Sequence, residues 1–198
     1  MDYDNLIRNW HTRAGEEDYS KFVFEYLAFI AYVKTKLYFS RDSSRTVTDR
    51  DAIQQLKRDE DIERRYSDHI QDKPELKKAW QKIKSELERS PLGNVSRSEY
   101  VEEIKWWNCS HKNLSEKTSD EESKISGVLH SLDDWENMIE FWYSIRNNLF
   151  HGGKDPEKGR DQRLVEFGYK TLRELVTILL RAGEFNNWFL LWETQPPF

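Results

Sequence analysis

Residues 134–154 read DWENMIEFWYSIRNNLFHGGK, a run of bulky apolar residues that ends in a double glycine. At about 100° per residue, one face of a helix over this stretch gathers five apolar side chains within roughly 60° of its centre. These are Trp135, Met138, Trp142, Ile145 and Leu149. Gly152 and Gly153 can adopt the positive φ that ends a helix. The stretch therefore predicts a helix over 132–150 with one face buried in a helical core.

Three polar side chains, Arg146, Asn147 and His151, accompany this apolar face. Arg146 lies about 40° from the buried centre, at the border of the core. Asn147 and His151 are side by side on the opposite face, about 140–180° from that centre. Because Arg146 and His151 are about 140° apart, one straight helix does not bring both to one phosphate. Either the chain bends at the glycines, or a second copy of the helix completes the site.

The chemistry of these side chains suits cleavage of RNA without a metal. Arginine bonds two phosphate oxygens at once through its planar fork. Histidine titrates near neutral pH and serves as general acid or base, and a helix C-terminus favours its charged form. Asn147 can donate its amide to a phosphate oxygen or orient the imidazole. In this reaction the 2′-hydroxyl attacks the neighbouring phosphorus while arginine offsets the charge of the transition state.

The spacing of arginine and histidine carries little information by itself. Arg64 and His69 repeat it, with Arg65 in the place of the asparagine and no glycine after the histidine. We interpret this second pair, in a densely charged helix, as ordinary surface. Residues 146–151 differ in their context, which is an aromatic helix before them and two glycines after them.

Residues 134–154, followed by DQRLV at 161–165, resemble the signature helix and loop of the HEPN superfamily. The family motif is an arginine, a polar residue, a short spacer and a histidine, which Arg146, Asn147 and His151 match. The resemblance covers residues 132–180. It implies a helical bundle, in which two motif helices meet in a homodimer or in a pair of HEPN domains and build a composite RNase site. Many members are toxins or antiviral effectors, and others have lost activity and act as binding partners. The variant that accepts nucleotidyl groups on a tyrosine two residues after the histidine does not fit, since Gly153 stands there.

The first half of the chain is also predicted to be helical. Residues 2–12 are expected to form a short helix, and residues 21–39 are apolar on nearly every face, which is typical of a central helix. Residues 48–90 are densely charged along a thin apolar stripe. They predict a long charged helical hairpin inserted on the core, with a solvated outer face.

The last third contains the motif helix and the helix that follows it, over 132–181. Leucines with helical spacing predict the second of these over 159–181, with Gly183 as its stop. Residues 108–126 are polar and predict a long loop. The aromatic tail over 185–192 is expected to pack on the core or in an oligomer interface. With 198 residues and 14% aromatic content, we expect a single all-α, HEPN-like domain over 1–198.

The net charge of −5 excludes a global field that gathers nucleic acid. Binding to RNA then depends on a local patch, for which the sequence offers a mildly basic collar after the motif. Lys154 and Arg163 are our candidates for positioning phosphates. An ordinary surface loop explains the same charges equally well.

Several classes of protein are disfavoured by what the sequence contains. Cys109 is the single cysteine, so neither an intrachain disulfide nor a cysteine-based zinc site is expected. No glycine-rich phosphate loop occurs, which disfavours an NTPase or a dinucleotide enzyme. The acidic first residues do not read as a signal peptide, and the apolar runs are too short to span a bilayer. We expect a cytoplasmic protein with no metal, no cofactor and no membrane contact.

The function predicted from the sequence is that of a metal-independent endoribonuclease, a toxin or antiviral defence effector with its site across a homodimer. Arg146 and His151 are the expected catalytic residues, with Asn147 in support. RNA is the expected partner, and an antitoxin or another protein subunit is a further candidate. The alternative is a non-catalytic HEPN interaction module, or a nucleotide-binding partner subunit. In that case the same residues cap the helix and stabilise a dimer.

Overall fold

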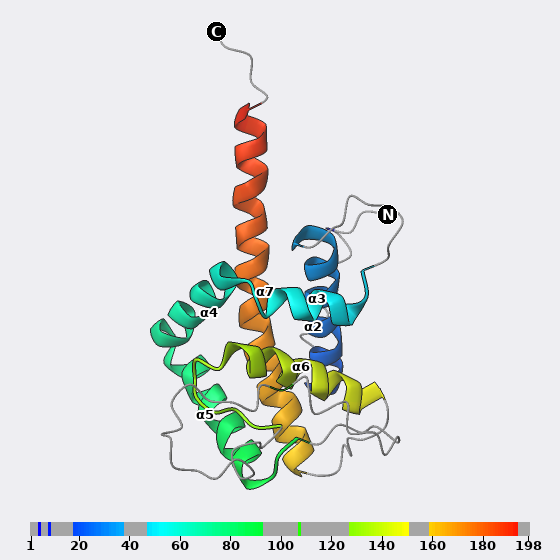
Figure 1. Ribbon diagram of the computed structural model, residues 1–198, viewed down its shortest axis with the longest axis vertical. Coiled ribbons are helices and arrows are strands. Elements are labelled where there is room, and N and C mark those ends of the chain that lie inside the picture. The colour runs from blue at the N-terminus through cyan, green and yellow to red at the C-terminus, as the bar shows by residue number, and fades with distance from the viewer. Residues whose placement is uncertain are drawn as a thin grey trace.

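The computed structural model describes residues 4, 8, 18–37, 47–92, 107, 127–150 and 159–193; for residue 18 and residues 182–193 it describes the backbone alone. Within these ranges all regular structure is helical, which confirms the all-α class (Figure 1). The elements are α2 (Asp18–Tyr32), the π-helix η1 (Val33–Leu37), α3 (Asp49–Leu56), α4 (Glu60–Asp72), α5 (Pro74–Arg89), α6 (Trp135–Phe150) and α7 (Gly159–Glu193). None of the described helices is long and apolar enough to cross a membrane.

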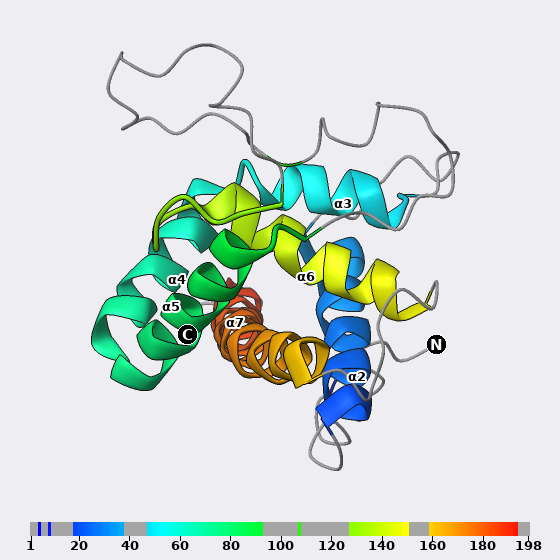
Figure 2. The same cartoon turned by 90° about the horizontal axis from the view of Figure 1, so that it is seen from below.

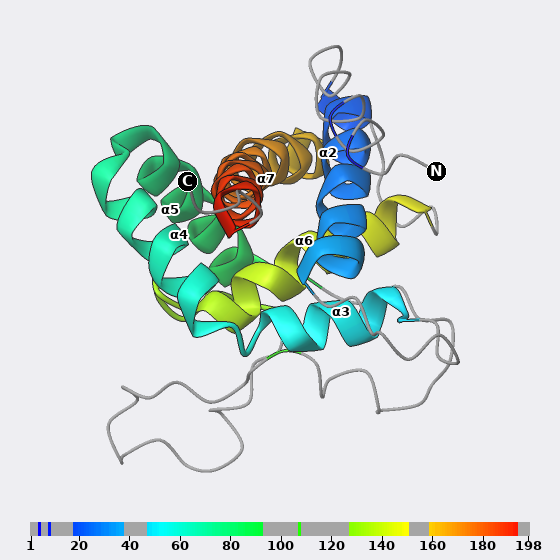
Figure 3. The ribbon, with the colours of Figure 1, turned by 90° about the horizontal axis from the view of Figure 1, so that it is seen from above.

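Helix α7 forms the axis around which the other helices pack. Seen along this axis, α2 lies on one side and α4 and α5 lie on another (Figures 2 and 3). Helix α6 covers a third side, with α3 beyond it. Gly168 lets α2 approach α7 closely, because a Cβ at this position would lie 3.2 Å from the ring of Phe22. The predicted burial of the helix over 21–39 is confirmed for its described part, since Phe22, Tyr26, Phe29 and Val33 are all buried. Its predicted central position is wrong, because α7 takes the middle of the bundle and α2 lies on one side of it (Figures 2 and 3).

Helix α6 has the predicted buried face. Trp135, Met138, Trp142 and Ile145 are buried, and Leu149 is partly buried against the core. The Nε1 of Trp142 donates a hydrogen bond to Thr171 Oγ1 over 3.0 Å. The helix begins at Trp135 rather than at 132. Asp134, the residue before it, marks this start, because its carboxylate accepts hydrogen bonds from the backbone N–H of His130 and from the side-chain amide of Asn137.

Residues 48–90 form three helices rather than the predicted hairpin of two. Thr48 begins α3 with a capping box that includes Asp51, and Asp59 caps a new helix, α4, by accepting from the backbone N–H of Ile62. Pro74 starts α5, where a proline suits the first helical position. The apolar stripes of all three helices are buried in the common core. The three helices therefore contribute to the core itself and are not an insertion packed on its outside.

Helix α7 continues through Gly183 to Glu193, so the predicted stop at Gly183 is wrong. One glycine inside a helix costs only about 1 kcal/mol relative to alanine, and no proline follows before Pro196. The C-terminal part of α7 extends beyond the other helices (Figure 1). Of the helix predicted over 2–12, only Asp4 and Arg8 are described, both as helical. The predicted loop over 108–126 and the side chains of 185–192 lie outside the described part of the chain.

Candidate functional site

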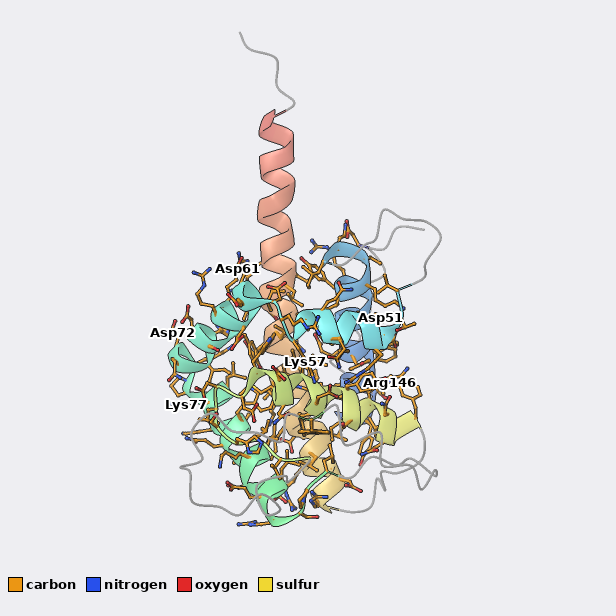
Figure 4. All side chains as sticks on the ribbon, in the orientation of Figure 1. Asp51, Lys57, Asp61, Asp72, Lys77 and Arg146 are labelled. Carbon is orange, nitrogen blue, oxygen red and sulfur yellow. The ribbon has the colours of Figure 1, made fainter. Side chains whose placement is uncertain are left out.

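Arg146 lies one turn before the end of α6, on the side of the molecule that also carries Asp51 of α3 (Figure 4). Its guanidinium carbon is 4.8 Å from the centroid of the Phe150 ring and 5.8 Å from that of the Tyr26 ring. Cation–π contacts of this kind contribute about 0.5–1 kcal/mol each at exposed positions. The side chain of Arg146 is 30% exposed. The two rings therefore hold the guanidinium in place while part of it faces solvent.

Asn147 is in direct contact with Arg146. The Nη1 of Arg146 donates a hydrogen bond to Asn147 Oδ1 over 2.9 Å. This contact orients the side-chain amide, so its NH2 group is directed away from the guanidinium. Asn147 is half-buried rather than turned fully to solvent, because helices cover α6 on more than one side. Two of the three predicted catalytic residues are thus neighbours in space as well as in sequence.

A carboxylate from α3 lies beside the guanidinium. The Oδ2 of Asp49 is 3.8 Å from Arg146 Nη2, and its Oδ1 accepts a hydrogen bond from Lys34 Nζ over 3.0 Å. Lys34 belongs to η1, the π-helical turn that follows α2. Two cations from different helices therefore meet at one carboxylate at the edge of the core.

Tyr26 lies on the buried side of this group. Its side chain is 1% exposed, and its hydroxyl has no hydrogen-bond partner among the described residues. Burial raises the pKa of the Tyr26 hydroxyl well above its ordinary value, against the opposing charge of Arg146 and together with the carboxylate of Asp49. The hydroxyl is therefore a neutral donor within electrostatic range of both residues.

A second charged cluster holds α3 on α6. The carboxylate of Glu140 is buried on α6 and contacts two cations from α3. Arg50 Nη2 lies 2.7 Å from Glu140 Oε1, which also contacts Lys57 Nζ. The guanidinium of Arg50 lies 5.2 Å from the centroid of the Tyr143 ring. Lys34, Arg146 and Asp49 belong to the same part of the molecule, where α3 meets α6 and η1.

The remaining predicted site residues are not brought to Arg146 by any described contact. His151 and Lys154 lie outside the described residues. Arg163 is the fifth residue of α7, and its Nε donates to Glu86 Oε1 of α5 over 3.0 Å. Its side chain is 49% exposed. This ion pair ties α7 to α5, and phosphate binding by Arg163 stays a prediction.

The repeated arginine–histidine spacing has no comparable setting. Arg64 is exposed and pairs with Asp61 of its own helix at 2.8 Å, as predicted for a surface residue. His69 is partly buried instead, because its Nε2 lies 2.8 Å from Glu174 Oε2 of α7. Lys73 Nζ lies 2.6 Å from the other oxygen of the same carboxylate. His69 and Lys73 therefore join the end of α4 to α7 through Glu174, and His69 does not form a site with Arg64.

In comparisons with known proteins, no family model, no curated protein and no solved structure matches the chain. The resemblance to the HEPN superfamily therefore stays a prediction that rests on the motif residues and their context. In the described part of the chain, no group of histidine, cysteine, aspartate or glutamate side chains could hold a metal ion.

Sequence reasoning did not find Tyr26, Lys34 and Asp49. Tyr26 is one of many aromatic residues in the run that predicts the central helix, and nothing marks its hydroxyl. Asp49 is one of many acids in the densely charged stretch over 48–90, and it lies in the first turn of α3. Lys34 offered a weak signal. It is the first cation after the long apolar stretch that begins at Phe22, in which Glu25 is the single charged residue.

Proposed function

We propose that the protein is a metal-independent endoribonuclease of the HEPN type. The observation that carries the proposal is the contact between Arg146 and Asn147 at the partly exposed end of α6. Two aromatic rings fix the arginine there, and the chain continues from this point to His151. A fixed, accessible guanidinium with an amide beside it is suited to hold a phosphodiester.

The proposed reaction assigns one task to each motif residue. His151 takes the proton of the 2′-hydroxyl, whose oxygen forms a new bond to the neighbouring phosphorus as the bond to the 5′-oxygen breaks. A histidine also returns a proton to that leaving oxygen, which gives a cyclic phosphate and a 5′-hydroxyl. Arg146 offsets the negative charge that develops on the phosphorus oxygens. Asn147 orients the phosphate or the imidazole.

A dimer gives the most economical form of this site. Arg146 and His151 project about 140° apart from one helix, so two motif helices that meet across a cleft would supply one full set from both copies. One His151 would act as base and the other as acid. As part of the same proposal, the enzyme is a cytoplasmic toxin or antiviral effector that an antitoxin or another subunit controls.

The test is cleavage of RNA in the presence of EDTA. Wild type is expected to cut, and His151→Ala and Arg146→Ala are expected to lose the activity while staying folded. His69→Ala is the matched control, because it removes the histidine of the second arginine–histidine pair and should leave cleavage unchanged. Cleavage that survives in His151→Ala, or that needs added Mg²⁺, would remove the proposal.

A non-catalytic interaction module is the second candidate, and one observation favours it. The guanidinium of Arg146 already has partners on several sides, in Asn147, Asp49 and two aromatic rings. A purely structural arginine would look the same, in a module that binds a partner subunit or a nucleotide. In that case Arg146→Ala should lower the free energy of unfolding by more than about 1 kcal/mol, and wild type should cut no RNA.

A further inference from the structure

Asp49 occupies a position that is built for an anion. Its carboxylate lies between Lys34 Nζ, at 3.0 Å, and Arg146 Nη2, at 3.8 Å. The longer distance exceeds that of a direct hydrogen bond between a guanidinium and a carboxylate. About a third of each of the three side chains is exposed, so solutes reach the position from solvent. The arginine is thus close to a carboxylate without being fully engaged by it.

Tyr26 gives an independent indication that another oxygen acceptor belongs here. A buried polar group without a partner costs about 1–3 kcal/mol, and such groups are rare in native proteins. The chain contains a direct comparison in Tyr66, which is equally buried. The Tyr66 hydroxyl donates to the carbonyl oxygen of Thr171 over 2.8 Å and accepts from Trp80 Nε1 over 3.0 Å. The Tyr26 hydroxyl lacks any described partner, and the guanidinium carbon of Arg146 lies 5.8 Å from the centroid of the same ring.

The backbone that supplies Lys34 is unusual as well. Helix α2 changes to a π-helix at Val33, and Lys34 is the second residue of that turn. Within the turn, Thr35 Oγ1 donates to the carbonyl oxygen of Ala31 over 2.6 Å. π-Helical turns are uncommon and are frequent at functional sites. Here the turn presents a lysine to the carboxylate of α3 beside the motif arginine.

We propose that Asp49 stands in for a phosphate group, which displaces the carboxylate and is then bound by Lys34 and Arg146. The Tyr26 hydroxyl donates a hydrogen bond to one oxygen of that phosphate. The carboxylate closes the site when no ligand is present and competes with any ligand that enters. The proposal rests on the proposed function only in taking RNA as the natural source of the phosphate.

The surrounding charges favour a phosphate over the resident carboxylate. A phosphodiester offers oxygens to two cations and one hydroxyl at once, whereas the carboxylate of Asp49 is tied to the start of α3. Arg50 and Lys57 are further cations at the two ends of α3, and both are engaged by Glu140. Lys34 and Arg146 are therefore the two cations assigned to the ligand.

The experiment is a calorimetric titration with inorganic phosphate at constant ionic strength. Asp49→Asn should bind phosphate at least about threefold more tightly than wild type, because the competing carboxylate is gone. Tyr26→Phe should bind about tenfold more weakly, which corresponds to about 1.4 kcal/mol for the lost hydrogen bond. The opposite signs of the two changes separate this site from a general effect of charge or packing.

Two matched variants serve as controls. Tyr66→Phe also removes a buried hydroxyl, and it should leave phosphate affinity unchanged. Asp61→Asn also removes one carboxylate, from the side of the molecule opposite Arg146 (Figure 4), and it should leave phosphate affinity unchanged as well. Thermal unfolding of each variant establishes that it is folded before titration.

Three results would overturn the inference. They are an Asp49→Asn protein that binds phosphate no more tightly than wild type, a Tyr26→Phe protein that binds as wild type does, and the absence of saturable binding in both wild type and Asp49→Asn. The outcome is separable from that of the proposed function. Protein that shows the opposite shifts but cuts no RNA would keep the phosphate site and remove the nuclease. Protein that cuts RNA, but whose phosphate affinity is the same in wild type and Asp49→Asn, would keep the nuclease and remove the phosphate site.

Discussion

Glu140 of α6 and Lys57 at the end of α3 form an ion pair inside the protein, with side chains that are 1% and 5% exposed. Burial lowers the pKa of Lys57, although the charge of Glu140 and its hydrogen bond oppose that change. Arg50 supplies a second cation to the same carboxylate. This cluster fixes α3 on the helix that carries Arg146, and it thereby sets the separation between Asp49 and Arg146.

Glu140→Gln should therefore destabilise the protein strongly. Removing one partner of a buried ion pair leaves an uncompensated charge and costs about 3–5 kcal/mol. Urea unfolding of wild type and variant measures this difference. Adding Lys57→Met to the variant should recover part of the loss, because the buried ammonium is then gone as well. Glu88→Gln, from the more exposed pair of Lys84 and Glu88, is the control and should change stability by no more than about 0.5 kcal/mol. A cost below about 1 kcal/mol for Glu140→Gln would contradict the role of the cluster.

Glu140 also illustrates why apolar periodicity predicted one face of α6 and missed the other. It lies about 160° around the helix from Trp142, where the sequence predicts contact with solvent. The position is buried because α3 covers it with Arg50 and Lys57. Periodicity reports which face meets apolar neighbours, and it does not reveal a polar layer whose partners come from about 90 residues away in sequence.

The candidate site was predictable only in part for the same reason. Arg146 and Asn147 follow from local sequence, since both the motif and their contact lie within one turn. Asp49 and Lys34 join them through the packing of α3 and η1, which local spacing does not encode. Helix starts are more local, because the capping box of Thr48 with Asp51 lies within four consecutive residues.

Loss of the hydroxyl group should change the free energy of unfolding differently at the two buried tyrosines, Tyr66 and Tyr26. Tyr66→Phe removes two hydrogen bonds and leaves the indole N–H of Trp80 without its acceptor, so we expect a loss of about 1–3 kcal/mol. Tyr26→Phe removes a hydroxyl that has no described partner, and its stability should be unchanged or higher. Chemical denaturation of both variants in parallel measures the two changes. A Tyr26→Phe protein that is as destabilised as Tyr66→Phe would show that its hydroxyl is bonded in the folded state.

The carboxylate of Glu174 should contribute an acid-dependent part of the stability. Burial raises its pKa, but hydrogen bonds and charges of His69 and Lys73 outweigh burial, and the net pKa lies below the ordinary value of 4.5. The stabilisation is therefore complete above the unfolded pKa and is lost as the pH falls through the lower folded pKa. Urea midpoints of wild type and Glu174→Gln should differ at pH 6 and converge toward pH 3. A difference that stays constant over this range would contradict the assignment.

Gly127 should tolerate no side chain. Its φ is +80°, and a Cβ would lie 2.5 Å from the carbonyl oxygen and 2.8 Å from the nitrogen of Leu92. The Leu92 N–H donates to the Gly127 carbonyl oxygen over 2.9 Å, so the two segments cannot move apart without losing this bond. Positive φ alone costs a side chain about 1–3 kcal/mol, and we expect Gly127→Ala to lose at least about 2 kcal/mol in urea unfolding once the clash is added. Gly159→Ala is the matched control, because a Cβ there meets only an ordinary contact of 3.5 Å with Arg163. Equal stability of the two alanine variants would mean that the segment before α6 is not held at Leu92.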